Sequence, residues 1–152
     1  MKTFRIIADL DERRFSQAGR SLAQGVIPLH VSAGDVSFPS SDWDDFGVVI
    51  LGWWLREFGD FMRGDQAVAV LRFMDGPYEI EISRGTLSDA CVVRCVRRQG
   101  EGRHDAVSCE VPADRILREI VRASRAVLAA YRRRGLWNKD CETLARCLPN
   151  VG

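Results

Sequence analysis

The longest regular pattern of apolar positions runs through residues 43–62. Apolar side chains recur there at spacings of three, four and seven residues, which places them in one broad stripe on a helix. Apart from Trp43, residues 40–45 are serines and aspartates, as is typical of a helix start, where Asp42, Asp44 and Asp45 would be favoured by the positive end of the helix dipole. We therefore predict an amphipathic helix over residues 43–62, with these acids at its beginning.

Alternating apolar and polar positions predict a run of strands after this helix. An apolar segment at residues 67–74 ends at Asp75, which with the next glycine forms a strong turn signal. Residues 78–83 then alternate strictly, with Glu79 and Glu81 on the polar face. Two further alternating segments follow, at residues 91–95 and 107–111. These segments predict an antiparallel meander.

Shorter patterns precede the helix. Residues 3–8 and 26–31 are predicted as strands, and residues 35–38 as the short hairpin partner of the second. Pro28 cannot donate a backbone hydrogen bond, which moves the second strand toward a sheet edge or a bulge. The polar residues 9–24 are predicted as a loop or an irregular short helix.

The last third of the chain predicts two more helices. A long one begins at residues 112–114 and ends near Arg134, where Gly135 follows, a residue common just past a helix end. A short one starts at Asn138 or Asp140 and ends at Leu148. We find no repeat, low-complexity tract or linker, so residues 1–152 are expected to be a single domain. We predict the α+β class, with a meander sheet of about five to six strands, one central helix, and a long C-terminal helix packed on it.

Length, cysteine count and charge narrow the class of protein. The chain has 152 residues and five cysteines, and the odd count argues against a closed disulfide framework and fits a reducing cytoplasm. We see no signal peptide and no stretch long enough to span a membrane. The net charge is +1, but residues 35–93 carry four basic and eleven acidic groups, whereas residues 94–152 carry thirteen basic and seven acidic groups. Such a bipolar distribution steers charged partners.

Residues that could carry chemistry do not form a site in the sequence. The two histidines, His30 and His104, have no partner at metal-ligand spacing. Cys91 and Cys95 share the apolar face of a predicted strand, where core packing is favoured over zinc or redox chemistry. No nucleophile motif or phosphate-binding glycine loop is present. We expect no catalysis, no metal and no cofactor.

An arginine-rich face and one glutamate leave alternatives open. The arginines between Arg115 and Arg134 could meet nucleic-acid phosphates, but Asp114 and Glu119 interrupt them, so a solvated helix face is favoured and no nucleic acid is expected. Glu57 falls inside the apolar stripe of its helix. It is interpreted either as an acid at the edge of the stripe that pairs with an arginine such as Arg72, or as part of an interface beside an exposed tryptophan.

The order of these elements resembles a known group of proteins. A Phe-Pro-x-x-x-Trp-x-Asp segment runs from Phe38 to Asp45 and leads into the tryptophan-bearing helix, and an Asp-Gly-Pro-Tyr turn at residues 75–78 opens the glutamate-alternating strand. Over residues 26–132 this order resembles the small immunity proteins of bacterial polymorphic-toxin and contact-dependent-inhibition systems. The resemblance implies a cytoplasmic, non-catalytic protein that binds and neutralises one cognate toxin.

The charge distribution indicates where such a partner would bind. The acidic middle of the chain could cover the basic cleft of a nuclease-like toxin, since charge complementarity speeds association. The expected partner-binding residues are Asp42, Asp44, Asp45, Trp53, Glu57, Asp60, Asp75, Glu79 and Glu81. For the two glutamates of the alternating strand, a plain solvated face is the alternative. A monomer or weak homodimer is expected. The alternatives in function are a secretion chaperone or adaptor, and a nucleic-acid-binding module.

Overall fold

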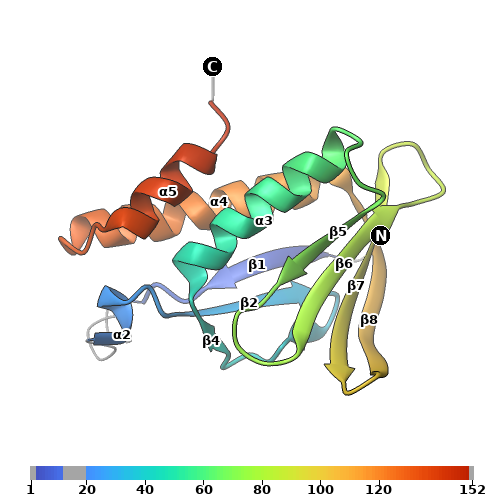
Figure 1. The fold of residues 1–152 in the computed structure, drawn as a ribbon, viewed down its shortest axis with the longest axis horizontal. Helices are drawn as coiled ribbons and strands as arrows, with labels where there is room; N and C mark the ends of the chain where they lie inside the picture. The colour runs from blue at the N-terminus through green and yellow to red at the C-terminus, as the bar shows by residue number, and fades with distance from the viewer. Residues whose placement is uncertain (1–2, 12–19, 151–152) are drawn as a thin grey trace.

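The computed structural model describes residues 3–11 and 20–150, whose strands form two antiparallel sheets (Figure 1). The α+β class is confirmed, but the prediction that all strands form a single meander sheet is wrong. Half of the predicted loop or short helix at residues 9–24, namely residues 12–19, lies outside the described residues, and the short α2 (Arg20–Ala23) lies near its end.

The first sheet is built from the N-terminal strands. Its members are β1 (Phe4–Ala8), β2 (Ile27–Ala33), β3 (Val36–Phe38) and β4 (Asp44–Asp45). The strand β2 pairs with all three others, so it is the centre of this sheet and not the edge that Pro28 suggested. The proline is tolerated because the β1 pairing ends at Leu29, and the Pro28 carbonyl still accepts a hydrogen bond from the Asp9 N–H at 3.0 Å.

The second sheet is the meander that the alternating pattern predicted. Its strands are β5 (Val68–Arg72), β6 (Tyr78–Arg84), β7 (Ala90–Gln99) and β8 (Gly102–Pro112), adjacent in chain order. Cys91 and Cys95 are fully buried on its inner face, as predicted for core packing. Burial raises the pKa of the Cys95 thiol to about 12, with a smaller contribution from Cys109.

The helices α3 (Gly47–Met62), α4 (Ala113–Arg133) and α5 (Lys139–Cys147) pack together on one side of the molecule (Figure 1). The predicted packing of one central and one C-terminal helix on a single sheet is therefore not observed. Instead α4 lies along β1 and α3, while α3 also contacts β5 and α5. None of the described helices is long and apolar enough to cross a membrane.

The beginning of α3 differs from the prediction. Asp44 and Asp45 pair with β2 as a short strand, so the helix begins at Gly47 and has no acid in its first turn. Gly47 lies so close to Ile27 that a Cβ would collide with the Ile27 side chain. The chain thus needs an extended segment and a glycine here, which the apolar periodicity alone does not indicate.

The outer edges of β1 and β5 are covered by side chains from the helices. On β1, the Ile6 N–H donates to Glu119 Oε1 at 3.1 Å, and Arg122 Nη2 donates to the Ile6 carbonyl at 2.6 Å. On β5, Glu57 and Trp54 play the same part, as described below. Edge strands otherwise offer unpaired backbone groups to other chains, so these contacts close two sheet edges.

Candidate functional site

Asp45 is a structural centre and does not face a partner, contrary to the prediction. The side chain is 0% exposed. Its Oδ1 accepts hydrogen bonds from the N–H groups of Phe46 at 2.7 Å and Met74 at 3.2 Å, and its Oδ2 from Trp43 Nε1 at 3.0 Å and the Asp75 N–H at 3.3 Å. The carboxylate therefore fixes the β5–β6 turn against β4.

Three predicted acids, Asp42, Asp44 and Asp75, are exposed and are brought together by this arrangement. Asp45 ties the turn that holds Asp75 to the segment that holds the other two. The hydroxyl of Ser40 donates to Asp42 at 2.7 Å and lowers the pKa of that carboxyl. We group these three exposed carboxylates, which lie on two segments joined through Asp45, as the acidic patch.

Glu79 and Glu81 are not the free carboxylates that strand alternation suggested. Glu79 is 7% exposed and contacts Arg98 closely, with Arg72 Nε at 3.8 Å. Glu81 pairs with Arg98 Nη2 at 3.1 Å and with Arg103 Nη2 at 2.7 Å. The pairing of β6 with its neighbours brings these arginines over the acidic face, so its charge is neutralised within the fold.

Glu57 is paired inside the fold, although not with an arginine. Its Oε1 accepts hydrogen bonds from Gln66 Nε2 at 2.8 Å and from the Val70 N–H at 3.1 Å. Trp54 Nε1 donates to the Arg72 carbonyl at 2.8 Å on the same strand edge. Glu57 and Trp54 therefore attach α3 to the outer edge of β5, and the predicted ion pair of Glu57 with Arg72 is replaced by this edge contact.

A pocket of about 350 Å³ lies along this seam between α3 and β5. It brings together three predicted residues, Trp53, Glu57 and Asp60, with others that the sequence reasoning did not select as a site. The lining residues are Trp53, Arg56, Glu57, Asp60, Val70 and Arg72. Asp60 is paired with Arg63, the residue that follows the end of α3. Arg56 follows Trp53 by three residues, the spacing of helical neighbours, which is the signal that could have identified it.

A smaller hollow lies on the other side of the same two residues, between α3 and α5. Trp53 and Arg56 line this hollow too, together with Asp140 and Leu144 of α5. Trp53 is 38% exposed, and the Arg56 side chain is exposed and makes no hydrogen bond or ion pair with the described residues. We call Trp53 and Arg56 the α3 ridge, since both project between two hollows.

The two histidines lie apart from this surface. His30 is half-buried in β2, where burial lowers its pKa more than the nearby Asp9 raises it. His104 is exposed on β8. In the part of the chain that the structure describes, no three histidine, cysteine or carboxylate side chains are placed to hold a metal ion.

No protein-family model, curated protein or solved structure matches this chain. The function must therefore be inferred from the surface that the fold presents. The two surface features described so far are the α3 ridge and the acidic patch, which are linked by residues 72–75 at the end of β5.

Proposed function

We propose that the chain is a protein-binding domain that uses the α3 ridge, and that its partner is a toxin which the domain neutralises. The ridge carries the proposal, because an exposed tryptophan stands beside an unpaired arginine and between two hollows. Tryptophan and arginine are the residue types most enriched among those that dominate binding energy in protein interfaces. A partner that fills the hollows would surround Trp53 and exclude water from it.

The acidic patch supports the choice of a basic partner. Asp42, Asp44 and Asp75 are exposed and none of them is ion-paired within the described residues. Met74, which precedes Asp75, is 38% exposed and adds an apolar contact between the patch and the pocket. Charges at the rim of an interface mainly raise the association rate. The ridge would thus supply affinity, and the patch would attract a toxin with a basic cleft, such as a nuclease.

On this proposal the domain acts by stoichiometric binding in the cytoplasm, as a monomer or weak homodimer, and does no catalysis. The resemblance to immunity proteins supplies the toxin as partner, and the geometry of α3 supplies the surface. Neutralisation would follow from covering the active site of the toxin, so one domain would inhibit one toxin molecule.

The test pairs this domain with the toxin domain encoded beside it. Growth of cells that express the toxin should be restored by the wild-type domain, and the two proteins should co-purify. Arg56→Glu and Trp53→Ala should each raise the dissociation constant at least tenfold. Thermal melting followed by circular dichroism checks that both variants still fold. Leu87→Ala, an exposed apolar residue in the β6–β7 loop, is the matched control and should bind normally.

Two outcomes would separate the parts of this proposal. If the domain fails to restore growth, the toxin-neutralising function is wrong. If growth is restored equally by Arg56→Glu, Trp53→Ala and Leu87→Ala, the α3 ridge is not the binding surface. A stable dimer that co-purifies with a secreted protein without inhibiting it would instead favour a secretion chaperone.

A further inference from the structure

A second charged surface covers the exposed side of α4. At 3.6 residues per turn, its arginines fall within an arc of about 100°, opposite the buried residues of the helix. They are Arg115, Arg118, Arg122, Arg125, Arg132 and Arg133. Arg5 of β1 lies beside them, with its Nε 3.7 Å from Glu119. We call these seven residues the α4 arginine face.

The two carboxylates on this surface neutralise little of it. Glu119 has 13% of its side chain exposed, and it is directed at β1, where it accepts from the Ile6 N–H and pairs with Arg122. Asp114 pairs with Arg118, and both are largely exposed. Seven guanidinium groups against two carboxylates leave a net charge of +5 on this face of a chain whose total is +1.

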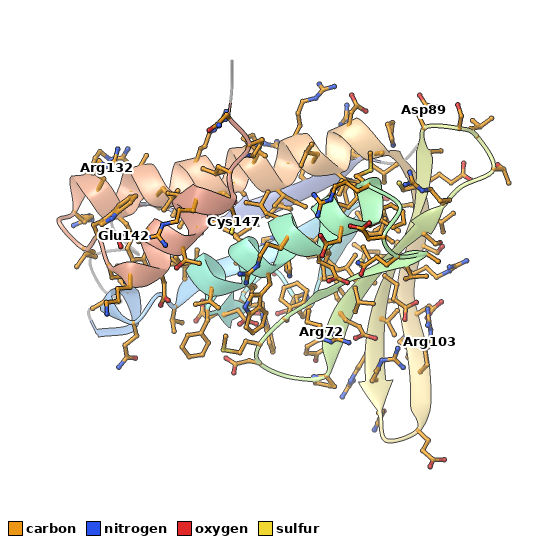
Figure 2. All side chains as sticks on the ribbon, turned by 45° about the horizontal axis from the view of Figure 1, so that its top comes forward. Arg72, Asp89, Arg103, Arg132, Glu142 and Cys147 are labelled. Atoms are coloured by element: carbon orange, nitrogen blue, oxygen red, sulfur yellow. The ribbon has the colours of Figure 1, made fainter. Side chains whose placement is uncertain are left out.

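Several of these arginines are available to a ligand. Arg115, Arg125 and Arg133 are exposed and make no hydrogen bond or ion pair with the described residues. Arg132 stacks on the Trp137 ring, with its Cζ 4.6 Å from the ring centroid. Figure 2 shows Arg132 at the end of α4, well away from Arg72 and Arg103 of the second sheet. The α4 arginine face is therefore separate from the α3 pocket.

We propose that the α4 arginine face binds the phosphate backbone of duplex nucleic acid without reading its bases. A guanidinium group can donate two parallel hydrogen bonds to a phosphate, and it keeps its charge at every physiological pH. A helix of 21 residues is about 31 Å long, and duplex DNA presents one negative charge per roughly 1.7 Å of its axis. Successive arginines between Arg115 and Arg125 are separated by about 4.5–6 Å along α4, so each could meet a different phosphate.

The composition of this face favours a duplex over a single strand. Binding of single strands uses exposed aromatic rings on which bases stack. Among the described residues, the ring beside this face is that of Trp137, and Arg132 already covers it. In Figure 1, β4, which carries Asp44 of the acidic patch, lies below β1 and β2, whereas α4 lies above them. At 0.1 M salt, charge repulsion is screened over about 10 Å.

The structure thereby changes the expectation of no nucleic acid. Asp114 and Glu119 interrupt the arginines in the sequence, but in the fold Glu119 is used to close the β1 edge. Nucleic-acid binding by α4 goes beyond the proposed binding of a toxin by α3, and the two can be tested separately because they use different surfaces.

The experiment is fluorescence anisotropy of a labelled 20-base-pair duplex DNA of arbitrary sequence, titrated with the full chain at several NaCl concentrations. We expect binding at low salt, with log K falling against log salt with a slope of about −3, as for contact with three to four phosphates. The double variant Arg115→Gln/Arg125→Gln should weaken binding at least tenfold and make the slope shallower by about 2, since each lost phosphate contact removes about 1.

A charge-matched control decides between a defined face and net charge alone. Arg63→Gln/Arg97→Gln removes the same charge from the residue that follows α3 and from β7, and should bind DNA like the wild type. Equal loss in both double variants, or no binding at about 20 mM NaCl, would overturn the proposal. Competition by poly-glutamate as strong as by unlabelled duplex would overturn the preference for phosphate. Arg115→Gln/Arg125→Gln should still restore growth against the toxin, which distinguishes failure here from failure of the proposed function.

Discussion

Replacing Asp45 by asparagine tests whether this residue is a structural centre. The substitution keeps the shape of the side chain, but asparagine has one oxygen where aspartate has two. Each oxygen of Asp45 accepts two hydrogen bonds. In either orientation of the amide, two buried donors therefore lose their acceptor and face an NH₂ group.

The size of the effect follows from these two lost contacts. Hydrogen bonds to charged groups contribute about 1.5–3 kcal/mol each, and removing the buried charge offsets part of that loss. We expect Asp45→Asn to lower the free energy of unfolding by about 3 kcal/mol. For a domain of this size that corresponds to a fall of roughly 6–12 °C in Tm.

The assay is urea denaturation followed by circular dichroism, with Asp44→Asn as the neighbouring control. Asp44 is exposed, so its substitution should change the free energy of unfolding by less than about 0.5 kcal/mol. Hydrogen exchange should also accelerate at the amides of Met74 and Asp75 in Asp45→Asn. If the two variants unfold at the same urea concentration, Asp45 does not hold the β5–β6 turn and the structural assignment is refuted.

Three further predictions concern single side chains. Glu57→Ala should lower the free energy of unfolding by about 1 kcal/mol and expose the Val70 amide to hydrogen exchange. Glu57→Gln keeps an acceptor oxygen and should change both quantities less. Equal protection of the Val70 amide in all three forms would contradict this. Burial tends to raise the pKa of Glu119, but hydrogen bonds from Arg122 and the Ile6 N–H lower it overall. In urea titrations, the wild type should therefore lose stability more steeply than Glu119→Gln as the pH falls from about 5 to 3. Alkylation at pH 8 and peptide mapping should find Cys147, which is half-buried, modified before Cys95, which is buried with a raised pKa; the reverse order would show that the sheet opens.

The parts of the fold that the sequence predicted are those in which one periodicity persists. The stripe of α4 and the alternation of β6 each extend over several turns or residues, and both elements were placed within about two residues. The prediction of where α3 begins was wrong because Trp43 and Phe46 fit the helical stripe. In the structure, Asp44 and Asp45 instead pair with β2 as a short strand. The division into two sheets could not be predicted, since it depends on which distant strands pair.

Residue type alone could not predict which of the candidate site residues the fold would bury or pair. A carboxylate has the same appearance in a sequence whether it meets solvent or four buried donors. Asp45 and Glu79 were expected at the surface, yet the fold surrounds both with partners from strands far away in the chain. Trp53 was expected to be exposed beside Glu57, and this residue is 38% exposed on α3.

The same consideration explains why the functional surfaces are sparse. Glu57 of α3 and Glu119 of α4 each accept a hydrogen bond from the backbone of an edge strand, and so attach their helix to the open edge of that strand. Both carboxylates are engaged at these edges, and Glu119 pairs there with Arg5 and Arg122, so other arginines nearby remain in excess. Arg56 on α3 and Arg125 on α4 therefore remain without partners among the described residues. An unpaired guanidinium gains most from a ligand that supplies the missing anion, so both proposed surfaces follow from the way in which the helices cover the sheets.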